Sequence, residues 1–134
     1  MDTPLQDIFE KYKKEIELDT AVDEINIKDV QLKLPAIKHK WVARLIHAKS
    51  DLKRLQSARW TALEQIKNPN TPPVRLPEDN KMAAASKQAV VVRIDQQISQ
   101  QELIIEYLTK VEVIMKSMTY DLANAIKIIQ LETT

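Results

Sequence analysis

The sequence predicts an all-α protein, and three observations support this prediction. The 134 residues include no glycine, the residue that tight turns between strands prefer. Few runs alternate between apolar and polar side chains, as the strands of a half-buried sheet would. Two long stretches instead repeat their apolar residues at helical spacing. We therefore expect a long basic central helix and a long C-terminal helix, joined by a proline-rich loop and preceded by short helices.

Composition indicates a single domain over residues 1–134. Apolar residues make up 44% of the chain and charged residues 29%, which is the balance of a folded protein. Because cysteine is absent, disulfides and thiolate metal sites are excluded. The N-terminus MDTPLQDIFEKYKK has no apolar secretion segment, and no apolar run approaches the ~20 residues that span a bilayer. We therefore expect a cytoplasmic protein without membrane contact.

The first 34 residues are predicted to form two short acidic helices, with nine acidic and five basic side chains between them. Thr3 followed by a proline is typical of a helix N-terminus, and this helix is expected to end near Glu15. A second piece, capped by Asp19 or Thr20, is expected to run to about Leu34. The proline that follows should break the helix or begin a new one.

The central helix is predicted over residues 36–67, and it should pack against another long helix. The stretch contains no proline and spans ~45 Å at the usual rise. Its apolar residues fall at alternating steps of four and three, which is a heptad seam, with Arg59 in one place of the stripe. The apolar members of this seam are Trp41, Leu45, Ala48, Leu52, Leu55, Ala62 and Ile66.

The C-terminal helix is predicted over residues 83–131, after a proline-rich loop at residues 68–80. The loop carries four of the six prolines and is not expected to form helix or central strand. In the helix that follows, a second apolar stripe lies roughly 90 to 120° from the first. The first stripe is Leu108, Val111, Met115, Met118, Leu122, Ile126 and Ile129, and the second is Leu103, Tyr107, Ile114, Ala125 and Ile128.

Two apolar stripes on one helix favour self-association. A hairpin of two long helices covers one stripe on each, and every leucine or isoleucine left in water forgoes about 1.5 to 3 kcal/mol. A ring-like homo-oligomer is the closed way to cover the remainder. The residues expected at subunit contacts are Leu103, Tyr107, Leu108, Val111, Ile114, Met115, Met118, Leu122, Ile126 and Ile129.

Basic charge is concentrated on the central helix, where eight lysine and arginine residues accompany two acidic ones. A lysine row with an aromatic ring suits single-stranded nucleic acid, because ammonium groups follow the phosphates and a ring stacks on any base. The alternative is a solvated face with Trp60 buried at a subunit contact. Lys38, Lys49, Lys53 and Lys67 share one side of the helix with Trp60, and Lys40, Arg44 and Arg54 share another.

We expect no enzymatic activity, cofactor or metal site. Without glycine, a phosphate-binding loop, a dinucleotide fingerprint and a nucleophile elbow cannot exist in standard form. His39 and His47 have no carboxylate cluster to complete a zinc shell. Glu102 and Glu106 lack the Glu-x-x-His pattern of a carboxylate metal site.

Four elements follow one another along nearly the whole chain. They are an acidic N-terminus, a basic helix ending in LKRLQSARWTALEQ, a proline-rich loop and a C-terminal helix ending in NAIKIIQLE. This order resembles the UvsY recombination mediator family of tailed phages. The resemblance implies a ring of about six or seven subunits that binds single-stranded DNA in the infected bacterial cell. Such a mediator hydrolyses nothing itself. It helps to load the phage RecA-like recombinase onto DNA coated with the phage single-strand-binding protein.

The DNA-contacting motif of that family, approximately Lys-Ala-Arg-Leu-Asp-Tyr-Tyr-Ser-Gly, begins where this chain has Ser57-Ala58-Arg59-Trp60. Arg59 matches the arginine of the motif, whereas Ser57 replaces its first basic residue and the paired tyrosines are missing. A charge in an apolar seam is costly unless it meets an anion or a partner carboxylate, and in a mediator the anion would be DNA. The expected DNA-binding residues are Lys49, Lys53, Arg54, Arg59, Trp60 and Lys67.

A function of another class is also consistent with the sequence. In this alternative the chain is a helical scaffold or assembly adaptor, and its basic helix binds acidic protein surfaces instead of nucleic acid.

Overall fold

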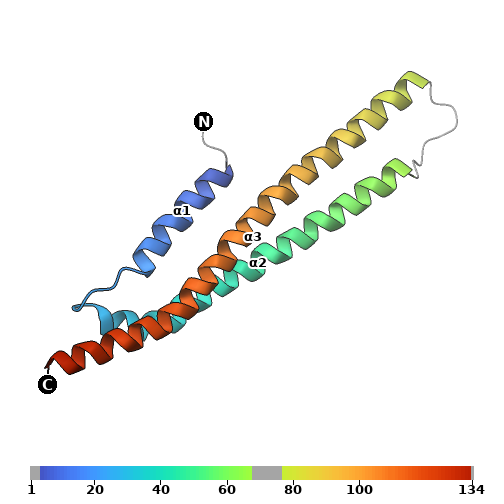
Figure 1. Ribbon diagram of the computed structural model, residues 1–134. Helices are drawn as coiled ribbons and strands as arrows, with labels where there is room; N and C mark the ends of the chain where they lie inside the picture. Colours follow the sequence, from blue (N-terminus) through green and yellow to red (C-terminus); the bar gives the residue numbers. More distant parts are fainter. Residues whose placement is uncertain (1–3, 68–76, 134) are drawn as a thin grey trace. The chain divides into compact units, whose positions relative to one another are not determined.

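The chain forms three helices in the computed structural model, which describes residues 4–67 and 77–133, with the side chains of residues 4–66 and 88–133. The helices are α1 (Pro4–Asp19), α2 (Ile27–Lys67) and α3 (Pro77–Thr133) (Figure 1). The described ranges contain no strand. The prediction of an all-α protein is confirmed.

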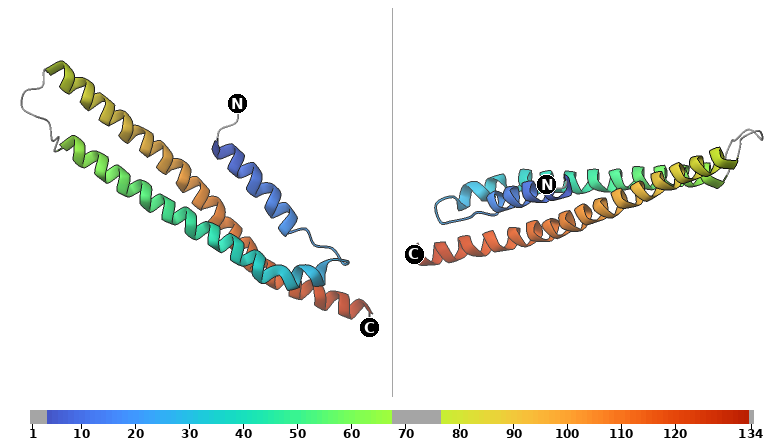
Figure 2. Two further views of the ribbon diagram at one scale, coloured as in Figure 1. Left: turned by 180° about the vertical axis from the view of Figure 1, so that it is seen from behind. Right: turned by 90° about the horizontal axis from the view of Figure 1, so that it is seen from above.

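Two compact units divide the chain. The first unit comprises Met1–His47 and Ile104–Thr134, so it holds α1, the N-terminal part of α2 and the C-terminal part of α3. The second unit comprises Ala48–Leu103, in which the remaining parts of α2 and α3 run side by side as an antiparallel pair (Figure 2). The interpretation of the chain as a single domain stays a prediction.

The helix α1 extends four residues beyond its predicted end at Glu15. It stops where the backbone N–H and the Oγ1 hydroxyl of Thr20 both donate to the carbonyl of Ile16, at 2.9 and 2.6 Å. These bonds pair a carbonyl that the end of a helix would otherwise leave free. Asp19 and Thr20 therefore end α1, and the prediction that one of them caps the second helix is wrong. The predicted cap at Thr3 lies outside the described residues.

A turn held by side-chain hydrogen bonds precedes α2. The Oδ1 atom of Asp23 accepts the N–H groups of Ile25 and Asn26, both at 2.8 Å. Asn26 accepts the N–H of Asp23 at 2.7 Å through Oδ1 and donates to the carbonyl of Ala21 at 3.0 Å through Nδ2. Short aspartate and asparagine side chains bond nearby backbone groups in this way at turns and helix starts. This network fixes the connection from α1 to α2.

Pro35 lies inside α2, so the predicted break at this position is wrong. A proline within a helix removes one hydrogen bond and costs about 3 kcal/mol. Leu34 and Trp41, on either side of it, are only 6% and 1% exposed, and both belong to the first unit. Burying each such side chain contributes about 1.5 to 3 kcal/mol. Packing on both sides of the proline therefore offsets its cost, and the helix continues through it.

The helix α3 begins at Pro77, six residues before its predicted start at residue 83. The predicted loop at residues 68–80 is therefore too long at its C-terminal end, and residues 68–76 lie outside the described ranges. Proline is favoured at the first position of a helix, because its missing N–H would be unpaired there in any case. The last proline of the cluster thus starts a helix instead of preventing one.

The core of the first unit is the seam between α2 and α3. Trp41 and Leu108 are its most enclosed side chains, each 1% exposed. The helix α1 contributes no fully buried residue, and it packs Phe9 and Tyr12 against Tyr107 of α3, with ring centroids 5.5 and 6.1 Å apart. The buried residues of this unit are Ile27, Leu34, Trp41, Leu45, Ile104, Leu108, Val111, Met115, Met118 and Leu122.

The second unit has a thinner core. Ala48 is its one fully buried residue among those with described side chains, and Nε2 of Gln101 donates to the Ala48 carbonyl at 2.9 Å. The other apolar seam residues are half-buried, because two helices without a third cover the seam incompletely. These residues are Leu52, Leu55, Ala62 and Ile66, so the predicted seam of α2 is confirmed.

Candidate nucleic-acid interface

One face of α2 carries the predicted basic row and its aromatic ring. Lys49, Lys53 and Trp60 fall within about 40° of one another around the helix, at 3.6 residues per turn. All three are exposed, and Trp60 retains 66% of its accessible surface. Neither lysine has a hydrogen bond or ion pair to any described residue. The side chain of Lys67, which was predicted to extend this row, lies outside the described part.

Arg54 forms a weak ion pair with Asp51, one turn earlier on α2. The two side chains are 77% and 47% exposed. Exposed pairs of this kind contribute about 0 to 1 kcal/mol, since water screens the charges and the side chains lose freedom. Arg54 can therefore turn from its partner to a phosphate at little cost.

Arg59 has a carboxylate partner on α3 within the second unit. Its Nε atom donates to Oδ1 of Asp95 at 2.6 Å, and the side chains are 43% and 48% exposed. The anion that this charge requires in the seam is thus Asp95, so the seam position needs no DNA to explain it. A guanidinium has five N–H donors, and the bond to Asp95 uses one of them. Arg59 is consequently anchored at one edge and half open to solvent.

Two of the three basic residues on another side of α2, Lys40 and Arg44, are bonded to α1. The Nζ atom of Lys40 lies 2.6 Å from Oδ2 of Asp19 and 3.6 Å from Oε2 of Glu15. Arg44 donates through a terminal nitrogen to Oε2 of Glu15 at 2.6 Å. This hydrogen bond lowers the pKa of Glu15, against an opposing effect of burial, because it favours the charged carboxylate. The acidic charge of α1 therefore neutralises part of the basic charge of α2.

Aromatic rings surround these ion pairs. Nε1 of Trp41 donates to Oδ2 of Asp19 at 2.8 Å. The guanidinium of Arg44 lies 4.7 Å from the Trp41 ring centroid and 5.3 Å from that of Tyr12, within the range of cation–π attraction. Burial raises the pKa of Tyr107, which stacks on Tyr12. We call the set Glu15, Asp19, Lys40, Trp41 and Arg44 the α1 clamp.

Sequence reasoning missed the α1 clamp, although its signal is present in the sequence. Glu15 and Asp19 are four residues apart, as are Lys40 and Arg44, so each pair occupies one face of its helix. Matching acidic and basic pairs on two helices are typical of helices that lie side by side. Several other acidic pairs occur in the chain, however, and only the fold selects this one.

Half of the residues expected at subunit contacts are buried inside a single chain. They lie at the seam of α3 with α2, so they are not available to another subunit while this fold persists. These residues are Leu108, Val111, Met115, Met118 and Leu122. The expected residues that remain exposed or half-buried are Leu103, Tyr107, Ile114, Ile126 and Ile129.

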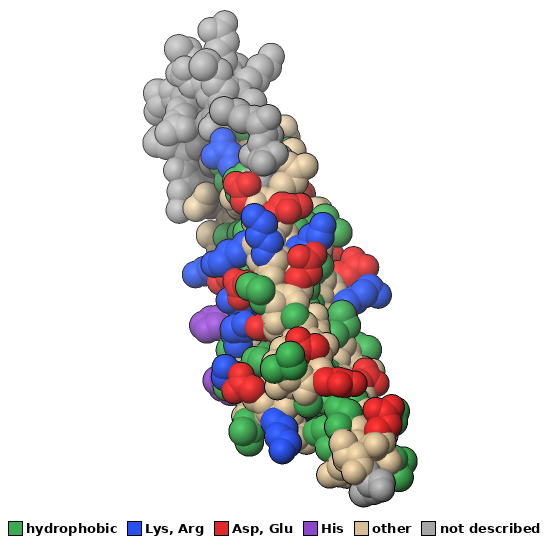
Figure 3. All heavy atoms as spheres, turned by 90° about the vertical axis from the view of Figure 1, so that its left-hand side faces the viewer, with side chains coloured by type: hydrophobic (Ala, Val, Ile, Leu, Met, Phe, Trp, Pro, Cys, Tyr) green, Lys and Arg blue, Asp and Glu red, His purple; other side chains and the backbone are tan. Residues whose placement is uncertain are grey.

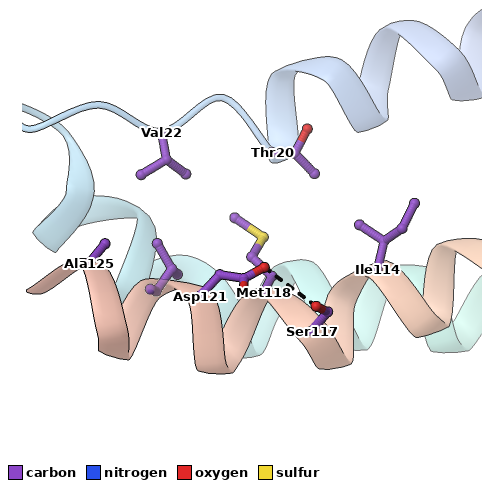
Figure 4. Close-up of a pocket in the computed structure, with 8 residues that line it drawn as sticks. Thr20, Val22, Ile114, Ser117, Met118, Asp121 and Ala125 are labelled. Atoms are coloured by element: carbon purple, nitrogen blue, oxygen red, sulfur yellow. Dashed lines mark hydrogen bonds between the residues drawn. The ribbon is translucent and has the colours of Figure 1, made fainter.

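An open groove of about 560 Å³ lies in the first unit beside the second apolar stripe of α3. Thr20 and Val22, from the connection after α1, line one side of it, and α3 lines the other (Figure 4). Ser117 donates to Oδ2 of Asp121 at 3.4 Å along that helix. Its other lining residues are apolar, so the groove brings together no pair of titratable side chains for acid–base chemistry. They are Ile114, Met118, Leu122 and Ala125.

Charged side chains of both signs are interspersed over the face shown in Figure 3. His39, His47, Glu102 and Glu106 are exposed. Within the part of the chain that the structure describes, no three histidine, aspartate or glutamate side chains are placed to hold a metal ion. No helix in that part is long and apolar enough to cross a membrane.

Comparison of the chain with family models, curated proteins and solved structures gives no match.

Proposed function

We propose that the chain binds single-stranded DNA through the exposed face of α2 and acts as a recombination mediator. One observation carries the proposal: Lys49, Lys53 and Trp60 stand together on this face without a carboxylate partner in the described residues. Elsewhere on the helix, Lys40 and Arg44 have such partners within the chain. The face of Lys49, Lys53 and Trp60 is thus left open, whereas Lys40 and Arg44 are paired with carboxylates.

The chemistry of this face matches a flexible strand better than a duplex. Lys49 and Trp60 are separated by eleven residues, or about 16 Å along the axis, which several nucleotides of a single strand can follow. Ammonium groups neutralise phosphates, and an exposed indole stacks on an unpaired base for about 1 to 3 kcal/mol. Bases of a duplex are already stacked, so Trp60 would add little there. Arg54 and Arg59 flank the row and supply further donors.

The mediator role adds assembly and partners to this binding. In a ring of about six or seven subunits, each copy presents the same weak site, and effective concentration makes the combined contact strong. A strand held in this way would be drawn from its single-strand-binding protein and offered to a RecA-like recombinase. The ATP chemistry would belong to the recombinase, so the mediator needs no enzymatic activity or cofactor of its own.

The side chains still available for subunit contacts belong to the outer faces of α3. Leu103 and Ile114 are 47% and 46% exposed, and Val113, Tyr120 and Leu131 are 62%, 75% and 76% exposed. Exposed apolar side chains mark an interaction surface where they form a contiguous patch. We propose that these faces, instead of the buried stripe, carry the contacts between subunits.

A helical adaptor is the second candidate, and one observation favours it. Val42 and Ile46 continue the spacing of the basic row, at steps of four and three that pass through Lys49 and Lys53 to Trp60. Both are exposed, at 40% and 61%. In a coiled coil the seam is apolar and charges lie beside it. Val42, Ile46 and Trp60 would therefore contact the partner helix, and the two lysines would meet its acidic residues. In this alternative the occupant of the face is a protein helix.

Salt-dependent binding of a labelled ~30-nucleotide single strand, followed by fluorescence anisotropy, tests the proposal. Replacing both lysines (Lys49→Gln with Lys53→Gln) should lower the affinity and reduce the log–log salt slope by about 1.4, since each phosphate contact on a single strand contributes about 0.7. The matched control is Lys13→Gln with Lys14→Gln, which removes the same charge from exposed positions on α1. An equal loss in both variants, or no binding at low salt, contradicts the DNA function and favours the adaptor.

A further inference from the structure

The helix α1 is held to the first unit by charge and ring contacts instead of a buried core. None of its residues is fully buried, and Ile8, Phe9, Tyr12 and Ile16 are only half-buried. Its ionic contacts are also accessible, with side-chain exposure of 24% for Glu15 and 17% for Asp19. The seam between α2 and α3 holds ten buried side chains and does not include α1. Of the three helices, α1 therefore has the weakest hold on the unit.

The residues that α1 covers, Lys40 and Arg44, resemble the lysines of the open face of α2, which consists of Lys49, Lys53 and Trp60. Lys40 and Arg44 are two cationic side chains four residues apart, as Lys49 and Lys53 are. The ring of Trp41 is buried, unlike that of Trp60, so it offers only its indole N–H. Lys40 and Arg44 remain 35% and 26% exposed, so a ligand can approach them from solvent. The covered residues thus form a second basic set of the kind that the open face presents.

Carboxylates occupy the positions that phosphate oxygens would take in this second set. Lysine and arginine bind both groups through charge-assisted hydrogen bonds of similar length. Glu15 and Asp19 satisfy these donors at 2.6 Å, and Asp19 also accepts the indole N–H of Trp41 at 2.8 Å. An exchange of carboxylates for phosphates would keep the number of bonds nearly constant. Such an exchange has a small net free energy, and the direction it takes depends on how strongly each competitor is held.

We propose that Lys40, Trp41 and Arg44 form a second phosphate-binding site for single-stranded DNA, which Glu15 and Asp19 of α1 occupy in the free protein. This inference rests on the proposed function, since the strand must first be held by the open face. The covalent link keeps α1 at a high effective concentration, so it excludes weak anions such as a free nucleotide. By the 3.6-residue period, Lys40 and Arg44 lie on the side of α2 opposite Lys49 and Lys53, so a strand held at the open face must pass round the helix before it displaces the carboxylates. The helix α1 thereby makes tight binding conditional on a ligand long enough to reach both sites.

The test removes the two covering charges without removing the site. The variant Glu15→Gln with Asp19→Asn should bind the ~30-nucleotide strand more tightly than the wild type, with a log–log salt slope steeper by up to about 1.4. The control Asp7→Asn with Glu10→Gln makes the same change of net charge on the same helix, at exposed positions without a described ion pair. Affinity that rises equally in both variants overturns the proposal, because the gain would then reflect net charge alone.

Adding Lys40→Gln and Arg44→Gln to the first variant provides the second arm. The gain in affinity should disappear, and a gain that persists shows that the strand uses other residues. If circular dichroism shows that the double change unfolds α1, Glu15→Gln alone can be used, since the bonds of Asp19 remain.

Failure of the proposed function and failure of the covered site give different results. Wild-type binding without the gain contradicts only the covered site. Binding by the uncovered variant alone contradicts the open face and the requirement that the strand bind there first. Absence of binding by both proteins contradicts both proposals.

Discussion

Replacing Arg59 with alanine removes the one charge in the seam of α2, and the structure sets the expected size of the effect. The ion pair with Asp95 is about half exposed on both sides, so its loss should lower the free energy of unfolding by only about 0.2 to 1 kcal/mol. A phosphate contact made by the outward edge of the guanidinium is worth about 1.5 kcal/mol at this exposure. Arg59→Ala should therefore reduce the affinity for a single strand by about tenfold. The proposed oligomer should survive the substitution.

Asp95→Ala should act in the opposite direction on DNA binding. It leaves Arg59 in place and removes the carboxylate that competes with phosphate, so the affinity should rise or stay constant while stability falls slightly. Anisotropy titrations, urea denaturation and light scattering of both variants measure these three quantities. The reasoning is refuted if Asp95→Ala weakens binding as much as Arg59→Ala does. It is also refuted if Arg59→Ala dissociates the proposed oligomer, because Arg59 would then be a structural residue.

Three further predictions follow from burial and charge. Leu108→Ala should lower the free energy of unfolding by about 2 to 5 kcal/mol, and Leu103→Ala by much less, since the two side chains are 1% and 47% exposed; urea denaturation measures both. Trp60→Ala should weaken single-strand binding by about 1 to 3 kcal/mol and change stability by less than about 0.5 kcal/mol, and a matching loss of stability would indicate a packing role instead. The pKa of Glu15 is lowered in the folded protein, so its ionised carboxylate stabilises the fold fully above the ordinary glutamate pKa, and this stabilisation is lost as pH falls through the lowered value. Urea midpoints measured at acidic pH should show the loss of stability. In the Glu15→Gln variant this contribution to the pH dependence should be absent.

The helical fold was predictable because its determinants are local. The absence of glycine and the spacing of residues such as Trp41, Leu45 and Ala48 need no knowledge of the partner helix. The ends of the helices were less predictable, since they depend on local residue preferences and also on packing against other helices. Local rules predict that a helix ends at Pro35, yet buried neighbours on both sides keep α2 continuous. The cluster of prolines predicts a loop that includes Pro77, yet proline is also favoured at the first position of a helix, and Pro77 starts α3.

The candidate site was likewise predictable in part from the sequence. By itself, the sequence determined which side chains share a face of a helix, because the helical period fixes their directions, and so it placed Lys49, Lys53 and Trp60 together. Only the tertiary structure decided which charges meet a partner from another helix. It joined Arg44 to Glu15 across 29 positions of sequence. It also paired Arg59 with a carboxylate, one of the two kinds of partner that a charge in the seam requires. Pairings between helices depend on how the helices pack, and no local spacing encodes that choice.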